Sequence, residues 1–239
     1  MAGPDRETST NRKRSCAEVL RRRILTMALE PGVHLDEGGL AEEFGLSRPP
    51  LREILRELAG EGYVTLAPHR GAEVAPMTHR TLRSFFRAAP MIYAATARLA
   101  AESATEAQIM RLKDTQLLFR AAIRDGDVAE RALLNERFHA IIGEMAHNDY
   151  LAPSLRRLLI DHTRIGMTFY DPRQGHLAAS RAEAADQHDR FIALIEAGDA
   201  DGAEALALAH WELSRAEMER FIAPAPMQMP LDRRGRAGA

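Results

Sequence analysis

Two groups of side chains in this 239-residue sequence have the types and the spacing to do chemistry. Arg48, Arg52 and Arg56 recur every four residues, which places them on one face of a helix. Arginine binds phosphate and pairs with the O6 and N7 atoms of guanine, so this row is typical of a helix that reads DNA. The alternative is a solvated helical face on which the arginines pair with Glu53 and Glu57.

The second group consists of three histidines, each on a largely apolar helical face: His139, His188 and His210. Imidazoles from different helices could converge on a divalent metal ion, and Asn135, one turn before His139, could add an oxygen ligand. A single histidine on such a face is more often a hydrogen-bonded core residue. A metal site and a histidine-containing core therefore stay open as alternatives.

The sequence offers little for catalysis. A three-histidine metal centre with an open position can activate water, but a hydrolase also needs a carboxylate base. Neither Glu136 nor Glu144 shares a helical face with His139, and the sequence contains no His-Glu-x-x-His run and no serine elbow. We expect no enzyme; a metal-dependent hydrolase and a helical interaction module without a metal site are the alternatives.

Composition limits the class of protein. The chain is 46% hydrophobic and 5% aromatic, so Leu, Ile, Ala and Met must fill its core. Its net charge of −2 gives no overall preference for nucleic acid, and the single cysteine excludes an internal disulfide. The sequence has neither a signal-peptide pattern nor a window of about 18 apolar residues, so we expect a soluble, cytoplasmic protein.

The arginine row needs a helix that begins near residue 47. Ser47 is a good N-cap, which makes Arg48, Pro49 and Pro50 the first three helical positions. Backbone N–H groups have no partner inside a helix at these positions, so proline loses nothing there. The two prolines therefore mark the beginning of a helix, and its apolar face is formed by Leu51, Ile54, Leu55 and Leu58.

The elements around this helix predict a winged helix-turn-helix within residues 15–76. In chain order we expect a helix over 17–28, a helix over 37–44 capped by Asp36, the arginine helix, and strands over 63–66 and 72–75. Such an arrangement presents the first turns of the arginine helix to the major groove. At the hairpin tip, Arg70 and Gly71 could enter the minor groove.

The rest of the chain shows only helical periodicity. Residues 77–222 predict an antiparallel bundle of six or seven helices, which makes the whole protein mainly α. The polar segment 1–14 and the Pro-, Gly- and Arg-rich segment 223–239 are expected to be disordered tails.

The first region resembles the N-terminal domain of GntR-superfamily bacterial transcription regulators. The matching residues are Pro31-Gly32, Leu40-Ala41, Gly45, Ser47-Arg48, Pro50, Arg52-Glu53, Leu58, Glu61-Gly62, Arg70-Gly71 and Val74. Pro49 and Gly38 depart from the family pattern, which often has a small residue such as threonine and an arginine there. From the residue pattern and the resemblance together, we expect the DNA contacts to come from Ser47, Arg48, Pro50, Arg52, Arg56, Arg70 and Gly71.

The helical region resembles the FCD ligand-binding domain of the FadR-type branch, in the segments 135–151 and 187–210. The resemblance implies a divalent metal (zinc, nickel or manganese) on Asn135, His139, His188 and His210, with Asn135 replacing the family's aspartate. It also implies a small carboxylate effector on that metal. Arg87 falls where the family has an arginine, so we assign it to effector binding, with a surface or interdomain salt bridge as the alternative. His162 and His176 could line the ligand cavity, but loop or surface positions are favoured for both.

Together the two resemblances imply a ligand-responsive transcription regulator. We expect a repressor that is released from DNA by a small organic acid. A palindromic operator mirrors two-fold protein symmetry, so we also expect a homodimer.

Overall fold

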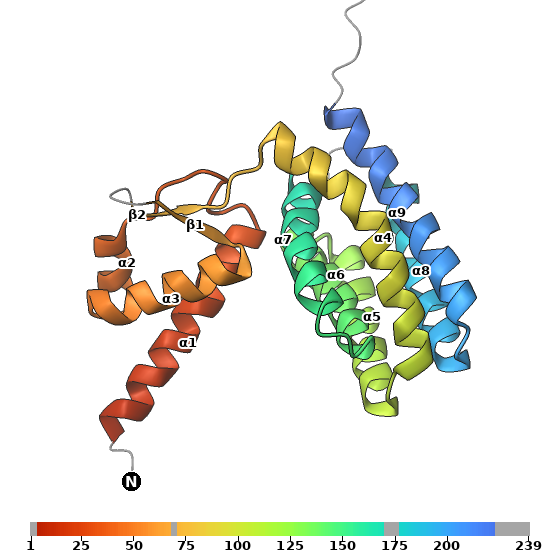
Figure 1. Cartoon of the computed structure of the whole chain (residues 1–239), viewed down its shortest axis with the longest axis horizontal. Helices are drawn as coiled ribbons and strands as arrows, with labels where there is room; N and C mark the ends of the chain where they lie inside the picture. Colours follow the sequence, from red (N-terminus) through yellow and green to blue (C-terminus); the bar gives the residue numbers. More distant parts are fainter. Residues whose placement is uncertain (1–3, 68–70, 170–176, 223–239) are drawn as a thin grey trace, which may run out of the picture.

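The chain folds into two lobes that are joined by one segment (Figure 1). The computed structural model describes residues 4–67, 71–169 and 177–222. The N-terminal lobe contains α1 (Pro4–Leu25), α2 (Glu37–Glu43), α3 (Arg48–Glu61), β1 (Val64–Ala67) and β2 (Gly71–Val74). The C-terminal lobe contains α4 (His79–Ser103), α5 (Glu106–Asp125), α6 (Val128–Met145), α7 (Leu151–Phe169), α8 (Leu177–Ala197) and α9 (Ala200–Ile222).

These elements confirm the predicted fold class. Helix, helix, helix and a two-stranded antiparallel hairpin follow one another in the N-terminal lobe, as in a winged helix-turn-helix. Six helices form the described part of the C-terminal lobe, where α4 packs most extensively on α9. Each lobe encloses its own cluster of buried apolar side chains. None of the described helices has the length and apolar character that a membrane crossing requires.

The beginning of α3 agrees with its sequence, with one correction. Ser47 has the extended backbone of an N-cap (φ −80°, ψ 163°), and Pro49 and Pro50 occupy the first turn. The Ser47 side chain, however, forms no capping hydrogen bond. A capping oxygen accepts from the second or third helical N–H, and proline has none. The Ser47 hydroxyl is therefore left exposed at the helix start.

The helix α1 is longer than its sequence indicates. It begins at Pro4, so residues 4–14 of the segment expected to be disordered are helical, while residues 1–3 lie outside the described residues. Lys13 explains part of this order, because its Nζ donates to Glu53 of α3 at 2.7 Å. The helix ends at Leu25 rather than near residue 28, since Met27 takes a left-handed backbone (φ 61°). The expected tail over 223–239 lies outside the described residues.

The wing is displaced by one residue from its expected strands. In the hairpin, Val64 pairs with Val74 and Ala67 pairs with Gly71. Beyond the hairpin, the N–H of Ala75 donates to the carbonyl of Tyr63 at 2.9 Å. The chain therefore leaves the wing in an ordered conformation and enters α4 only a few residues later.

Candidate functional site

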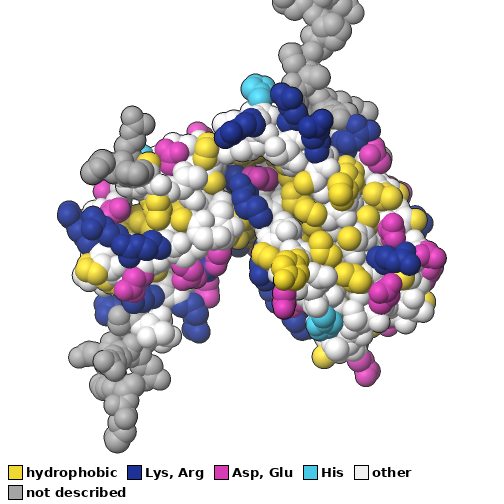
Figure 2. All heavy atoms as spheres, viewed as in Figure 1, with side chains coloured by type: hydrophobic (Ala, Val, Ile, Leu, Met, Phe, Trp, Pro, Cys, Tyr) yellow, Lys and Arg dark blue, Asp and Glu magenta, His cyan; other side chains and the backbone are white. Residues whose placement is uncertain are grey.

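The arginine row lies on the exposed face of α3. Arg48, Arg52 and Arg56 are all exposed, while the opposite face of the helix is buried against α1 and the hairpin. In Figure 2, Lys and Arg side chains gather over the region of α2 and α3. Nothing in the described lobe covers this face, so it is accessible to a DNA duplex.

The glutamates that could have neutralised the row are paired elsewhere. Glu53 accepts from Lys13 at 2.7 Å, and Glu57 accepts from Arg21 of α1 at 2.6 Å. Within the described residues, Arg48 and Arg56 belong to no ion pair. The alternative in which the arginines of α3 pair with Glu53 and Glu57 of the same helix is therefore wrong.

Arg52 has a partner in the neighbouring helix instead. Its Nε donates to Oε2 of Glu37, in the first turn of α2, at 2.9 Å. Arg52 is 55% exposed in its side chain and Glu37 is 23% exposed. The contact engages Nε of the guanidinium and leaves more than half of the side chain exposed. This pairing with α2 was not foreseen from the sequence.

The wing tip is partly described. Gly71 has φ 74°, and a Cβ there would lie 3.2 Å from the imidazole of His34. A side chain at this position would be strained and crowded, so glycine is required. Arg70, expected beside it at the tip, lies outside the described residues.

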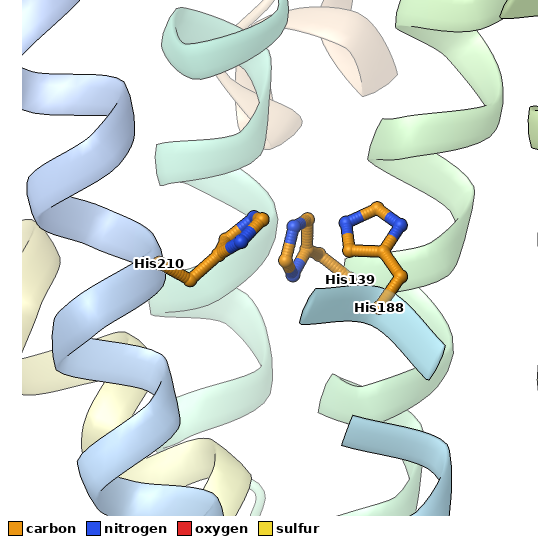
Figure 3. Close-up of side chains that lie close together, drawn as sticks. All are labelled: His139, His188 and His210. Carbon is orange, nitrogen blue, oxygen red and sulfur yellow. The ribbon is translucent and has the colours of Figure 1, made fainter. Parts of the chain in front are cut away.

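The structure brings His139, His188 and His210 together in the C-terminal lobe. One potential ligand atom of each lies within 4.8 Å of the others, and all three side chains are buried. They come from α6, α8 and α9, and Figure 3 shows their rings projecting into the same space between these helices. Asn135 is half-buried on α6, one turn before His139.

Two glutamines determine which ring nitrogens of this triad are free. The amide nitrogen of Gln116 donates to the carbonyl of Ala185 and to Asp189, so the amide oxygen faces Nδ1 of His188 at 3.2 Å. The Nδ1 of His188 must then carry the proton, which leaves its Nε2 with a lone pair. That Nε2 is buried without a hydrogen-bond partner.

The same arrangement recurs at His210. Gln187 donates its amide nitrogen to Glu183 at 2.9 Å and places its oxygen 2.8 Å from Nδ1 of His210. The Nε2 of His139 is also buried and has no partner. A hydrogen-bonded Nδ1 with a bare Nε2, as at His188, is the pattern of a metal-binding imidazole, so the residues fit a divalent ion. A tetrahedral ion needs its nitrogen ligands about 3.3 Å apart, so small side-chain movements would close the triad.

Burial keeps these imidazoles neutral. It lowers the pKa of His139 and His188 well below the ordinary value, and the neighbouring His210 adds to the effect. Burial also lowers the pKa of His210 to about 3. Neutral imidazole is the form that binds metal, so ligation near neutral pH would displace no proton from the triad.

A small cavity adjoins the triad. Its volume is about 20 Å³, room for one or two water-sized groups. Its lining is mostly apolar and aromatic and includes Tyr93, Thr96, His139, Ile142, Leu155, His162, Phe191, His210 and Trp211. Within this lining, Nδ1 of His162 lies 2.7 Å from the hydroxyl of Tyr93.

Of the two positions that the sequence left open for His162, the favoured loop or surface position is wrong, and His162 lines the cavity. His162 lies inside α7 and is 6% exposed, because the rotation of α7 points it into the bundle. Arg87 is exposed on α4 and does not line the cavity, since the inward face of that helix presents Phe85 and Ala89. His176 lies outside the described residues.

Sequence reasoning also missed the glutamines and aromatic residues of this site. A signal existed for Gln187, which directly precedes His188 in the sequence. No sequence signal marks Gln116 or Tyr93, because these residues lie on helices that contribute no histidine to the triad. Trp211 follows His210 and is the only tryptophan of the chain, which makes it a natural reporter of the cavity.

Comparison with protein families matches each lobe separately. Residues 13–74 match the family described as "Bacterial regulatory proteins, gntR family". Residues 86–213 match the "FCD domain" family. The first match contains the arginine row, and the second contains the histidine triad and the cavity.

Individual relatives agree with these matches. The HTH-type transcriptional repressor RspR of Escherichia coli (strain K12) is 33% identical over 130 residues, which are 54% of this chain and 56% of that repressor. The chain thus spans little more than half of that relative's length. A candidate regulator of the L-lactate dehydrogenase operon from the same strain is 31% identical over 233 residues, covering 86% of this chain and 85% of the relative. The solved structure of E. coli McbR/YncC has a TM-score of 0.74 at 20% identity and covers 89% of this chain and 99% of that one, which shows a shared fold.

Proposed function

The chain belongs to the GntR family of bacterial regulatory proteins and carries an FCD domain, and on this premise we propose that it is a cytoplasmic, ligand-responsive repressor of transcription. Its relatives are regulators rather than enzymes, so a hydrolase is not favoured. The observation that carries the proposal is the arginine face of α3, which stays exposed because α1 takes up the competing glutamates.

The DNA-binding part of the proposal rests on the first two turns of α3. Arg48 and Arg52 are exposed on these turns and would meet base edges or phosphates in the major groove, and the uncapped hydroxyl of Ser47 would add a phosphate contact. Arg56 would meet the backbone further along the groove. Pro50 fixes the beginning of the helix, and Arg70 and Gly71 would enter the minor groove from the wing.

The experiment for this part is a fluorescence-anisotropy titration of DNA fragments enriched by the protein from a random library. We expect the double variant Arg48→Ala, Arg52→Ala to lose most affinity and to reduce the salt dependence of binding by about one unit of slope for each lost phosphate contact. Arg124→Ala, Arg190→Ala is the matched control, because both arginines are exposed on the other lobe. Full affinity in the α3 double variant would refute the proposed mode of DNA binding.

The sensing part of the proposal rests on the histidine triad. His139, His188 and His210 would hold zinc, nickel or manganese, with the oxygen of Asn135 as a further ligand. Such an ion acts as a Lewis acid and attracts an anionic group. The protein's own contribution is a set of neutral, oriented imidazoles beside a cavity whose apolar wall would cover the carbon part of a small carboxylic acid. Arg87 is exposed, so a role in effector binding would require it to act from outside this cavity.

Metal binding is testable without knowledge of the effector. Zn²⁺, Ni²⁺ or Mn²⁺ at about 100 times its dissociation constant should raise the free energy of unfolding by about 2.7 kcal/mol. Adding the ion to chelator-treated protein should therefore raise the melting temperature by roughly 5–10 °C. His188→Ala should abolish this shift, whereas His79→Ala, at an exposed position, should preserve it. A wild-type protein that binds none of these ions would leave an apo sensor.

Small organic acids can then be screened by the fluorescence of Trp211, with and without the metal. A ligand that changes this fluorescence and weakens DNA binding would be the effector of a repressor. We further propose that the protein acts as a homodimer on a palindromic operator, which sedimentation of the protein with and without DNA tests directly.

A further inference from the structure

The helix α7 contacts both lobes at once. It packs against α4, α6 and α9 within the bundle, and it also meets α1 and α3 of the DNA-binding lobe. Two consecutive residues in this helix, Asp161 and His162, face these two environments. The first belongs to a charged cluster at the lobe interface, and the second lines the cavity.

The carboxylate of Asp161 holds two arginines of its own helix. One oxygen accepts from Arg157 at 2.9 Å, and the other forms a short contact with Arg164. Arg164 is fully buried and donates through its other terminal nitrogen to the carbonyl of Ala75 at 2.6 Å. Ala75 directly follows the wing strand β2, so Asp161 and Arg164 bind α7 to the end of the wing.

Arg157 provides a second connection to the DNA-binding lobe. Its side chain lies against Gly62, where a Cβ would be only 2.5 Å from the arginine Cδ. Gly62 is the left-handed C-cap of α3, with φ 95°. The guanidinium held by Asp161 therefore lies directly against the end of the helix that carries Arg48 and Arg52.

The other side of the same helical turn faces the cavity. His162 is oriented by its hydrogen bond with Tyr93 of α4. Its ring lies at 28° to that of His139, which also lines the cavity, with 6.3 Å between the ring centroids. An occupant that extends from the triad to His162 must act on α7.

We propose that Asp161 is the positioning residue that transmits the state of the cavity to the DNA-binding lobe. A rotation or shift of α7 imposed at His162 moves Arg157 and Arg164 together, because one carboxylate holds both. Their contacts at Gly62 and Ala75 then change the setting of α3 and the wing at the same time. The inference rests on the proposed function for its purpose, but its contacts are independent of any ligand.

A partly buried cluster of this kind is weak evidence for a role in stability alone. Buried ion pairs are often no better for stability than apolar side chains of similar volume, because desolvation offsets their attraction. A purely structural role and a transmitting role therefore differ in one respect. Only the second makes the wing respond to a change inside the cavity.

The test is hydrogen exchange of the full chain, measured by mass spectrometry without DNA or ligand. Tyr93→Phe removes the hydrogen bond to His162 while preserving the ring. We expect exchange in residues 71–76, which include the hydrogen-bonded amide of Ala75, to become about fivefold faster, the ratio that one typical hydrogen bond produces. In an Asp161→Asn background, Tyr93→Phe should have no further effect on this segment.

The control is Thr115→Val, which removes a buried hydroxyl of α5 that bonds only within its own helix, to Arg111. It should leave segment 71–76 unchanged. Should Asp161→Asn fail to fold, Arg164→Met replaces it, because this variant keeps an unbranched side chain and removes the donors to Asp161 and to the carbonyl of Ala75. The inference is overturned if the effect of Tyr93→Phe stays within the bundle, or if it is equally large with and without Asp161. Because no DNA or effector is present, such a failure says nothing against the proposed function.

Discussion

Acidification from pH 7 to pH 5 should lower the free energy of unfolding of this protein, because burial keeps several of its histidines neutral in the folded state. Burial lowers the pKa of His162 to about 4 and that of His210 to about 3. In the unfolded chain both return to about 6.5, so between pH 6.5 and these values the unfolded state binds protons that the folded state refuses. Stability is thus fully present above pH 6.5 and is lost as the pH falls.

The magnitude follows from proton linkage. At pH 5, which is about 1.5 units below the unfolded-state pKa, protonation of one histidine stabilises the unfolded chain by about 2 kcal/mol. The buried histidine stays largely neutral, so the folded state does not gain this free energy. His162 and His210 together therefore remove about 4 kcal/mol, and the lowered pKa values of His139 and His188 act in the same direction. Glu136 acts in the opposite sense, because burial raises the pKa of its carboxyl. The loss is large beside a typical total stability of about 5–15 kcal/mol.

Urea unfolding of metal-free protein, followed by circular dichroism at several pH values, measures this loss. His162→Gln should reduce the pH dependence by about one proton, whereas His79→Gln, at an exposed position, should not change it. Equal stability at pH 7 and pH 5 would refute the reasoning. So would a His162→Gln variant whose pH dependence matches that of the wild type.

Three further substitutions test single contacts. Gly62→Ala should lower the free energy of unfolding by about 1–3 kcal/mol in urea unfolding, because the φ of Gly62 is 95° and a Cβ would lie 2.5 Å from an arginine of α7. Gly60→Ala is the control: a Cβ there meets open space, so this variant should be neutral or stabilising. Gln116→Leu removes the acceptor that orients His188, and competition with a chelating dye should show zinc affinity lower by about 10–100-fold. Asn135→Asp adds a charged oxygen near the triad and should tighten zinc binding by about tenfold or more in the same assay; unchanged affinity would place residue 135 outside the ligand set.

Features that are determined within one helical turn could be predicted from the sequence. Asp36 caps α2 by accepting from the N–H of Gly38 at 2.9 Å, and Gly45 takes the left-handed conformation (φ 59°) expected after this helix. The beginning of α3 at two prolines follows from the same local rules. Periodicity likewise placed His139, His188 and His210 on inward helical faces, because burial of one face repeats along a helix.

Features that depend on which distant segments meet could not be predicted. The extension of α1 depends partly on a contact between Lys13 and Glu53, which are 40 residues apart. The placement of His162 depends on how α7 is rotated between two lobes, and its own sequence neighbours, Asp161 and Thr163, are polar although buried. No periodic pattern marks such a turn as an inward face. The favoured surface position of His162 was wrong because the cavity that it lines is formed by several helices that are distant in sequence.

The charge of the triad determines which kind of second ligand a bound metal would favour. Among the described residues, the cluster of possible ligands consists of histidines alone, and all three are neutral. A divalent ion held by neutral imidazoles beside an apolar cavity keeps its full charge in a poorly solvated place, which is costly without a counter-ion. An anion that enters the cavity removes this cost, so metal and anion must each strengthen the binding of the other by the same factor. Asn135, one turn before His139, offers an amide rather than a carboxylate, so in the proposed site the negative charge would have to come from the anion itself. Occupancy of such a site by metal would therefore depend strongly on the anion.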